Sequence, residues 1–391
     1  MTDVLTAEEM LAKLVSFNTI SDRSNLPLIE FAHDYLAGHG IEAMLVPDPT
    51  GQKSSLFAQI GPAEAGGVML SGHTDVVPVE GQDWLTDPFS LAKADGKLFG
   101  RGTCDMKGFL AIALSLVPEF KAAHLKRPVQ FALTYDEEVG CFAAPPLIVE
   151  ARQHYPIASA VIVGEPTMMR VVNGHKSICE LHTFIRGFEV HSSLMHTGVS
   201  AVMTAARLIN WIEARGHANR AAAPEISGDT EGAEYTPPWT TLHVGEITGG
   251  TAHNITAKDC KFSLDIRCIP SETNADWIAK YRAHCAEIEA EMQKINPDTG
   301  IRVHVEGDVP GCRPEVNGFA ESLARQLTGD NAQHVVSYAT EAGQFQDGGY
   351  STIVCGPGSI EQAHQPNEYL SIDQLQAGVE FQRRLMTHLS T

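Results

Sequence analysis

The strongest constraint on the fold is the alternation of short apolar runs with helical patterns up to about residue 175. Runs such as 67–71, 129–134 and 160–163 have the length and apolar content of buried strands. Helices are expected over residues 7–17, 25–40 and 106–122. This alternation is typical of an α/β domain with a largely parallel sheet, in which ligands collect at the carboxyl ends of the strands.

The pattern changes at about residue 177. From there the order of elements is βαββαβ, which is a compact two-layer α+β unit. Its strands are expected near 177–186, 240–248, 260–268 and 301–306, its helices near 199–213 and 273–292, with a Gly/Ala/Pro-rich connection after the first helix. The α/β rhythm returns with helices at 318–327 and 372–388 and a strand at 351–355. The sequence therefore predicts one domain, residues 1–176 and 309–391, interrupted by an inserted domain, residues 177–308.

The composition excludes several classes of protein. The chain carries 28 Lys and Arg against 48 Asp and Glu, which gives a formal net charge of −20. Nucleic acids and anionic membranes are bound through basic patches, so neither is an expected partner. The first residues lack the pattern of a signal peptide, and the eight cysteines are scattered singly. We therefore expect a cytoplasmic protein with reduced cysteines.

Acidic and histidine side chains follow the predicted strands at the points where these strands end. The run 129–134 leads into Asp136, Glu137 and Glu138, whose like charges raise one another's pKa. The other candidates are His73 and Asp75 in GHTDVV, Asp105 before a helix in GRGTCDMKGF, Glu165 in GEPT, and His364 in GPGSIEQAHQPNEY. The carboxyl ends of parallel strands meet at one edge of a sheet, so these side chains are expected to lie close together.

Each candidate has an ordinary structural alternative. A histidine after a strand can be a turn residue, an Asp before a helix is often an N-cap, and an acid in a polar loop is usually solvated. The clustering favours a metal site, because divalent cations relieve the repulsion among several carboxylates. Two histidines and several carboxylates without cysteine suit Zn²⁺, with Co²⁺ or Mn²⁺ as alternatives. A site for two ions needs a carboxylate that bridges about 3.5 to 4 Å.

The motifs GHTDVV, GRGTCDMKG, the pair Glu137–Glu138, GEPT and AHQPNE resemble, in order, the signature set of the M20 family of metallopeptidases and deacylases. Within that family, TEAGQFQ followed by CGPGSIEQAHQPNEYL is most similar to members that deacetylate N2-acetyl-L-ornithine in arginine biosynthesis. The resemblance implies a zinc-peptidase-like catalytic domain and a metal-dependent amide hydrolase. The alternative substrates for such a hydrolase of this family are N-acetylcitrulline, succinyl-diaminopimelate or a dipeptide. A metal-binding protein without catalysis is not expected, because it would lack the base or a ligand and all of them are present. A phosphoesterase is not expected either, because no basic or Gly-rich phosphate cradle accompanies the metal site.

The resemblance also implies a role for each matching residue. The expected metal ligands are His73 and Glu165 for one Zn²⁺, Glu138 and His364 for a second, and Asp105 as the bridge. Asp75 would fix the ring of the first histidine, and Glu137 would be the general base. The family often has a cis peptide after the bridging acid, here between Asp105 and Met106.

The inserted domain resembles the lid and dimerisation domain of the family, which implies a homodimer. The segment EVHSSLMHTGVSA makes His191 the donor to the oxyanion, from its own or the partner subunit. GTAHNIT and DIR make Asn254 and Arg267 candidates for binding the substrate carboxylate, with a turn residue and a surface ion pair as the alternatives. Glu341 in TEAG is a candidate partner for the δ-ammonium of ornithine, and a solvated loop residue is the alternative.

Overall fold

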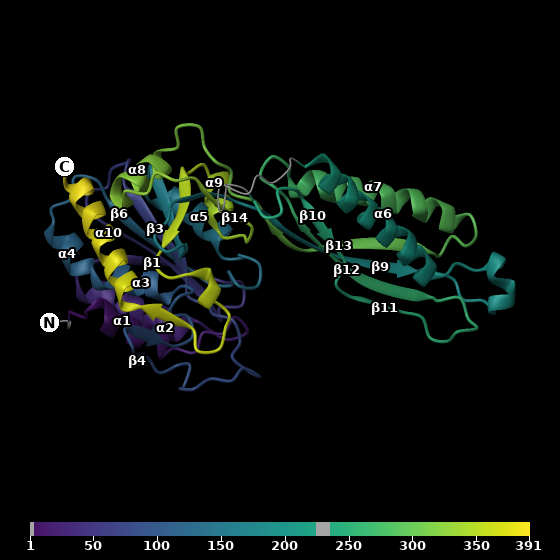
Figure 1. Ribbon diagram of the computed structural model, residues 1–391, viewed down its shortest axis with the longest axis horizontal. Helices are drawn as coiled ribbons and strands as arrows, with labels where there is room; N and C mark the ends of the chain where they lie inside the picture. The colour runs from purple at the N-terminus through teal and green to yellow at the C-terminus, as the bar shows by residue number, and fades with distance from the viewer. Residues whose placement is uncertain (1–3, 224–234) are drawn as a thin grey trace. The chain divides into compact units, whose positions relative to one another are not determined.

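The protein, in a computed structural model that describes residues 4–223 and 235–391, divides into two compact units. Unit 1 comprises Met1–Gly174, Cys312–Val335 and Thr340–Thr391, and unit 2 comprises His175–Gly311 and Val336–Ala339 (Figure 1). The predicted fold class, a mostly parallel α/β domain with an additional α+β domain, is confirmed. The catalytic and lid roles of these parts, with the boundaries given above, stay predictions.

Unit 1 is built on an eight-stranded sheet in the order β1-β2-β6-β3-β7-β15-β8-β14. The strands are β1 (Ala43–Pro47), β2 (Ser54–Ile60), β3 (Val68–His73), β6 (Val129–Thr134), β7 (Ala160–Pro166), β8 (Val172–His175), β14 (His334–Val336) and β15 (Thr352–Gly356). The four central strands β6, β3, β7 and β15 are parallel, whereas β1, β2 and β8 pair antiparallel with their neighbours. Four strand ends therefore point to one edge of the sheet.

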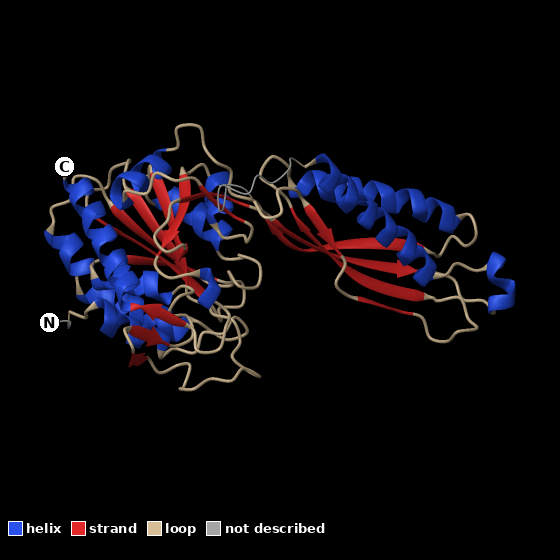
Figure 2. Ribbon diagram, viewed as in Figure 1, coloured by secondary structure: helices blue, strands red, loops and turns tan. Residues whose placement is uncertain are grey.

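Helices lie on both faces of this sheet (Figure 2). They are α1 (Ala7–Val15), α2 (Leu26–Gly38), α3 (Lys107–Ser115), α4 (Val117–Ala122), α5 (Ala144–His154), α8 (Phe319–Thr328), α9 (Ala342–Asp347) and α10 (Ile372–Ser390). The main core cluster joins α1, α2, α3, α8 and α10 to alternate sheet residues such as Leu70, Phe131 and Ile162, while α5 and α9 contact the sheet outside that cluster. Strands covered on both faces read as continuous apolar runs, which is why they were recognisable in the sequence.

The helices α5 and α9 were not predicted, and two further local features of unit 1 differ from the sequence prediction. The single helix expected over 106–122 is broken at Leu116, because Pro118 at the start of α4 has no N–H to continue the ladder of α3. A small sheet in the order β16-β5-β4, formed by β4 (Ala92–Ala94), β5 (Lys97–Phe99) and β16 (Tyr369–Ser371), was not predicted. Its short strands are only partly buried and carry little apolar signal.

Unit 2 is an antiparallel sheet in the order β10-β12-β9-β13, with β11 also paired to β12. Its elements are β9 (Ile178–Arg186), η1 (Ser192–Thr197), α6 (Ala201–Ala222), β10 (Thr241–His243), β11 (Ile247–Gly249), β12 (Asp259–Arg267), α7 (Asn274–Gln293), β13 (Gly300–Val309). The helices α6 and α7 lie on one face of the sheet (Figure 2). Their apolar side chains pack with those of β9 and β12 in a separate core.

The strand expected at 240–248 is two strands, β10 and β11. Their registers against β12 differ by one residue, since His243 pairs with Asp265 but Ile247 pairs with Phe262. An extra residue around Gly245 therefore interrupts the strand, as in a β-bulge. The helix expected at 199–213 continues to Ala222, and part of the Gly/Ala/Pro-rich connection that follows, 224–234, lies outside the described residues.

In the part of the chain that the structure describes, no helix has both the length and the apolar character needed to cross a membrane. The chain ends in α10, which packs against α3 and α8 of unit 1. None of the eight cysteines, all of which are described, forms a disulfide, and all are buried.

Candidate metal centre

The expected ligands lie at the carboxyl edge of the parallel strands of unit 1. His73 is the last residue of β3, and Glu165 is the penultimate residue of β7. Glu138 follows β6, and His364 lies in the loop after β15. Asp105 precedes α3, in a loop whose peptide bond to the next residue is cis. The fold thus brings five sequence-distant ligand candidates to one edge.

The end of β7, which carries Glu165, is tightly packed against its neighbours. A Cβ atom at Gly164 would lie 2.0 Å from the ring of Phe109 on α3, so only glycine permits this approach of helix and strand. Gly356 of β15 is equally close, because a Cβ there would lie 2.0 Å from the carbonyl oxygen of Gly164. The end of β7 is therefore held between α3 and β15.

One group of potential metal-ligand atoms surrounds the imidazole of His73. Its Nε2 lies 3.0 Å from Oδ1 of Asp105 and 3.6 Å from Oε1 of Glu165. That Glu165 oxygen is buried and has no hydrogen-bond partner among the described residues. A buried carboxylate oxygen without a donor is costly, and a cation at this point would satisfy it.

A second group surrounds the imidazole of His364. Its Nε2 lies 3.0 Å from Oε2 of Glu138 and 3.3 Å from Oδ2 of Asp105. The two oxygens of Asp105 thus face two different histidines, as expected of a bridging carboxylate. The backbone of His364 has a φ of 63°, which lies in the left-handed region.

The donor atoms also form two overlapping sets within 4.8 Å that both include His73, one with Glu137 and Glu165 and the other with Asp105 and Glu138. Glu137, the expected base, therefore lies within reach of the first group. The pairing of ligands with individual ions stays a prediction, because the same donors can be grouped in more than one way.

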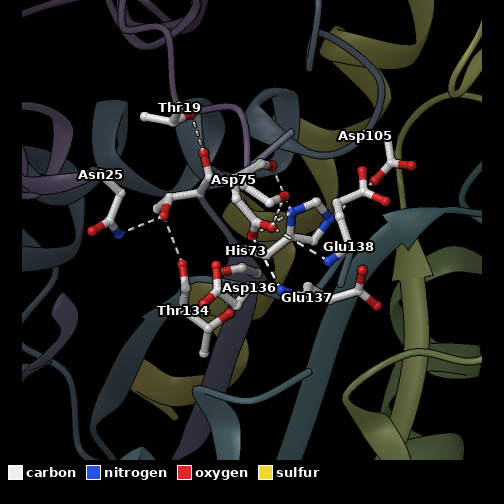
Figure 3. Close-up of polar contacts among 12 residues, drawn as sticks. Thr19, Asn25, His73, Asp75, Asp105, Thr134, Asp136, Glu137 and Glu138 are labelled. Atoms are coloured by element: carbon white, nitrogen blue, oxygen red, sulfur yellow. Dashed lines mark hydrogen bonds and ion pairs between the residues drawn. The ribbon is translucent and has the colours of Figure 1, made fainter. Parts of the chain in front are cut away.

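Asp75 fixes both His73 and the turn that carries Glu137 and Glu138 (Figure 3). Its carboxylate accepts the backbone N–H of Glu137 at 3.2 Å, that of Glu138 at 3.3 Å, and the hydroxyl of Ser21 at 2.7 Å. The Nδ1 of His73 donates to the carbonyl of Asp75 at 2.9 Å. This bond places the ring proton on Nδ1 and leaves Nε2 as the ligand atom.

The third acid of the strand end has a supporting position. Asp136 adopts a φ of 57°, and its carboxylate pairs with the ammonium of Lys53, which also donates to the carbonyl of Ser21. The pair is mostly buried, with 17% of the Asp136 side chain exposed. Sequence patterns did not single out Lys53 or Ser21, because both are polar residues outside any motif.

Without cations, the pKa values of the cluster are strongly perturbed. Burial raises the pKa of Glu137 and Glu165 well above the usual range, and it raises that of Glu138 to about 7. Hydrogen bonds to Asp105 and Glu138 raise the pKa of His364 to about 10. Burial acts against the ionised form of Asp105, yet hydrogen bonds from the two histidines hold its pKa below its usual value.

The raised pKa values favour the protonated forms of these acids and of the histidines beside them, because added protons reduce the repulsion among the carboxylates. Divalent cations would replace those protons. The donor set of imidazoles and carboxylates, together with the unsatisfied Glu165 oxygen, fits borderline divalent ions.

Glu341 lies beside this cluster and is not a solvated loop residue. It is 1% exposed at the start of α9, and its Oε2 accepts the hydroxyl of Thr134, the last residue of β6, at 2.9 Å. Its Oε1 is buried without a hydrogen-bond partner among the described residues. Burial raises the pKa of Glu341 to about 7.

The three remaining candidates belong to unit 2. His191 is exposed and lies next to the segment of Asn254, because it bridges to Ile255 and its neighbour Ser192 donates to the Asn254 carbonyl at 2.9 Å. Arg267 is the last residue of β12 and bonds Asp265 at 3.0 Å. Asn254 precedes the start of β12, so a strand of about 25 Å separates these candidates within one chain.

Glu368 is a further residue of the site that the sequence prediction left without a role. It is the acid of the AHQPNE motif, and its buried carboxylate accepts the backbone N–H of Asp105 at 3.0 Å. The signal was its place in a motif that already supplied a ligand.

The model of Peptidase family M20/M25/M40 matches residues 69–388 of the chain. Among curated proteins, an acetylornithine deacetylase of Myxococcus xanthus is 34% identical over 96% of this chain and 95% of its own length. An acetylornithine deacetylase of Pasteurella multocida is 31% identical over 98% of each.

Solved structures share the fold at low identity. An M20 family metallo-carboxypeptidase of Sulfolobus solfataricus has a TM-score of 0.74 at 18% identity and covers 99% of this chain and 100% of its own. The YXEP protein of Bacillus subtilis, described as a dinuclear metal-binding peptidase of the M20 family, has a TM-score of 0.62 at 14% identity, with 98% of both chains covered.

Proposed function

This chain belongs to peptidase family M20/M25/M40, and from that premise we propose that it is an acetylornithine deacetylase. It would hydrolyse the amide of N2-acetyl-L-ornithine to L-ornithine and acetate, a step of arginine biosynthesis. The observation that carries the proposal is the buried carboxylate of Asp105, which faces two histidines with its two oxygens. The relatives of matching length support the choice of substrate.

The centre would hold two Zn²⁺ ions per chain, with Co²⁺ or Mn²⁺ as alternatives. His73 and Glu165 would hold one ion, Glu138 and His364 the other, and Asp105 both. Two such ions, when bound, supply Lewis-acid activation of water and polarisation of the amide carbonyl. The distances of 3.0 to 3.6 Å among the donors support this assignment, since the side chains already converge.

Glu137 would act as the general base and then as the general acid. Its carboxylate lies within reach of His73 and Glu165, and its backbone N–H is held by Asp75. It would take a proton from the attacking water and return it to the leaving amine. Burial raises its pKa, which favours a carboxyl group able to hold that proton between the two steps.

Residues of unit 2 would complete the site in a homodimer. His191 would donate to the oxyanion, and Asn254 and Arg267 would bind the substrate carboxylate. Within one chain about 25 Å of β12 separates the first two from Arg267, so contacts of all three with one small substrate require two copies of the chain. Exposed apolar side chains beside His191, Leu194 and Met195 among them, also favour an interface there.

Glu341 would bind the δ-ammonium group of the ornithine side chain and so favour acetylornithine over substrates without a cationic side chain. Its Oε1 has no hydrogen-bond partner among the described residues, and a cationic side chain of the substrate would satisfy it. Replacing Glu341 by Gln should lower kcat/KM for acetylornithine and leave that for acetylmethionine unchanged. An unaltered ratio of the two would refute this role.

The function is tested with protein freed of metal and reloaded with Zn²⁺ or Co²⁺. Hydrolysis is followed by the product that each substrate gives: acetate from acetylornithine and acetylcitrulline, succinate from succinyl-diaminopimelate, and free amino acids from a dipeptide. Inorganic phosphate from a phosphate monoester is the control of another reaction class. The highest kcat/KM should fall on acetylornithine. A higher value for another acyl compound would move the protein to another M20 activity, and hydrolysis of the phosphate ester alone would refute the proposal.

We also propose a cytoplasmic location. Eight buried cysteines that form no disulfide are typical of proteins from reducing compartments. Fractionation of the source cells with immunodetection of the chain tests this, and recovery from an extracellular fraction would contradict it.

A further inference from the structure

The carboxylate of Glu368 organises the loop that presents Asp105. Its Oε1 accepts the backbone N–H of Cys104 at 2.8 Å and of Asp105 at 3.0 Å. Its Oε2 accepts the backbone N–H of Gly102 at 2.9 Å and an Nη1 proton of Arg101 at 2.8 Å. Three backbone N–H groups of this loop thus donate to one buried side chain, which is 1% exposed.

Arg101, which pairs with Glu368, extends the network to the loop that carries His364. Arg101 is also 1% exposed, and its Nη2 donates to Oε1 of Gln82 at 2.6 Å. The side-chain amide of Gln82 in turn donates to the backbone carbonyl of His364 at 2.9 Å. Trp84 covers these contacts, because its Nε1 also donates to Gln82 and its ring lies 5.0 Å from the guanidinium.

The network therefore joins the backbones of two expected ligands, Asp105 and His364. Their side chains meet at 3.3 Å, and both come from loops rather than from strands. Loop ligands need support from other side chains, because a metal site tolerates displacements of only about 0.5 Å. His73 and Glu165, by contrast, lie on β3 and β7, and within the described residues neither forms a hydrogen bond with Glu368.

We propose that Glu368, acting through Arg101 and Gln82, is a positioning residue for the half of the centre formed by Asp105, Glu138 and His364. Asp105 would hold both ions, but His364 would hold only the second, so the affinity of the second ion depends on Glu368 more than that of the first. This inference rests on the dinuclear centre proposed above.

Titration of the metal-free full chain with Co²⁺ tests the inference, followed by calorimetry and by the visible absorption of the bound ion. Wild type should bind two ions. Glu368→Gln keeps the shape but loses an acceptor and the charge, and it should weaken the second ion by about tenfold to 100-fold and the first by less. Gln82→Ala alters a half-buried surface loop, so it keeps the fold and should also weaken the second ion selectively.

Glu361→Gln is the matched control, because Glu361 is an exposed acid in the same loop and makes no side-chain contact to the network. Wild-type affinities for both ions in Glu368→Gln and Gln82→Ala would overturn the inference and leave the dinuclear centre standing. An equal loss in Glu361→Gln would overturn it too, since charge alone would then explain the effect. If Glu368→Gln does not fold, Gln82→Ala decides. Failure of wild type to bind two ions would refute the centre itself.

Discussion

Replacing Asp75 by Asn tests whether one carboxylate holds the catalytic turn. The native side chain accepts the backbone N–H of Glu137 on Oδ1 and that of Glu138 on Oδ2. Asn has the same shape but only one acceptor oxygen. Whichever way the amide turns, one of these two N–H groups faces an NH₂ group.

The magnitude follows from these contacts. Losing one hydrogen bond to a charged group costs about 1.5 to 3 kcal/mol, and the stranded N–H adds part of its desolvation penalty. The ring of His73, whose Nδ1 lies 3.5 Å from Oδ1, also loses a carboxylate neighbour. We expect Asp75→Asn to lower the free energy of unfolding of the metal-free protein by about 3 kcal/mol and kcat by about tenfold to 100-fold.

Urea denaturation of the metal-free chain at neutral pH measures the first quantity, and steady-state hydrolysis of acetylornithine by the reloaded enzyme measures the second. Asp22→Asn is the control, because 80% of that neighbouring acid's side chain is exposed. If Asp75→Asn unfolds within about 0.5 kcal/mol of wild type, below the usual value of one hydrogen bond, Asp75 does not hold the turn.

Three further outcomes are expected. Glu137→Gln should lower kcat by about 10² to 10⁴-fold while two ions stay bound, as measured by metal analysis of the purified variant; retained activity would exclude Glu137 as the base. Burial lowers the pKa of His175 to about 4, so the folded state favours the neutral ring and stability falls as the pH drops from about 6.5 towards 4, by about 1.4 kcal/mol per pH unit. Urea curves between pH 4.5 and 7 should show this slope in wild type and a shallower one in His175→Gln; equal slopes would contradict it. Phe262→Ala, in the core of unit 2 at 1% exposure, should cost about 3 to 5 kcal/mol in calorimetry but leave Co²⁺ binding by unit 1 within twofold of wild type.

The ligands could be read from the sequence because each follows or precedes an element with a clear apolar signal. His73 and Glu165 end strands buried on both faces, and such strands are continuous apolar runs. The family resemblance then added roles that no pattern contains.

Other features depend on tertiary contacts that leave no local trace. Lys53 and Gln82 are polar residues of ordinary loops, and only the fold brings them to Asp136 and His364. The bulge between β10 and β11 depends on the pairing with β12, which has no signature in the run 240–248 itself.

The interruption of unit 1 by unit 2 also bears on the order in which the chain can assemble. Pairing β7 with β15 joins residues separated by roughly 190 positions, a closure that costs conformational entropy. The first and last strands of the insertion are neighbours, however, since Ile178 pairs with Val309. If unit 2 forms first, the remaining loop is roughly 55 residues, which lowers the cost by about 1 kcal/mol. A self-contained insertion of this kind shortens the loop that must close when β15 pairs with β7, and so lowers the entropic cost of adding the last parallel strand.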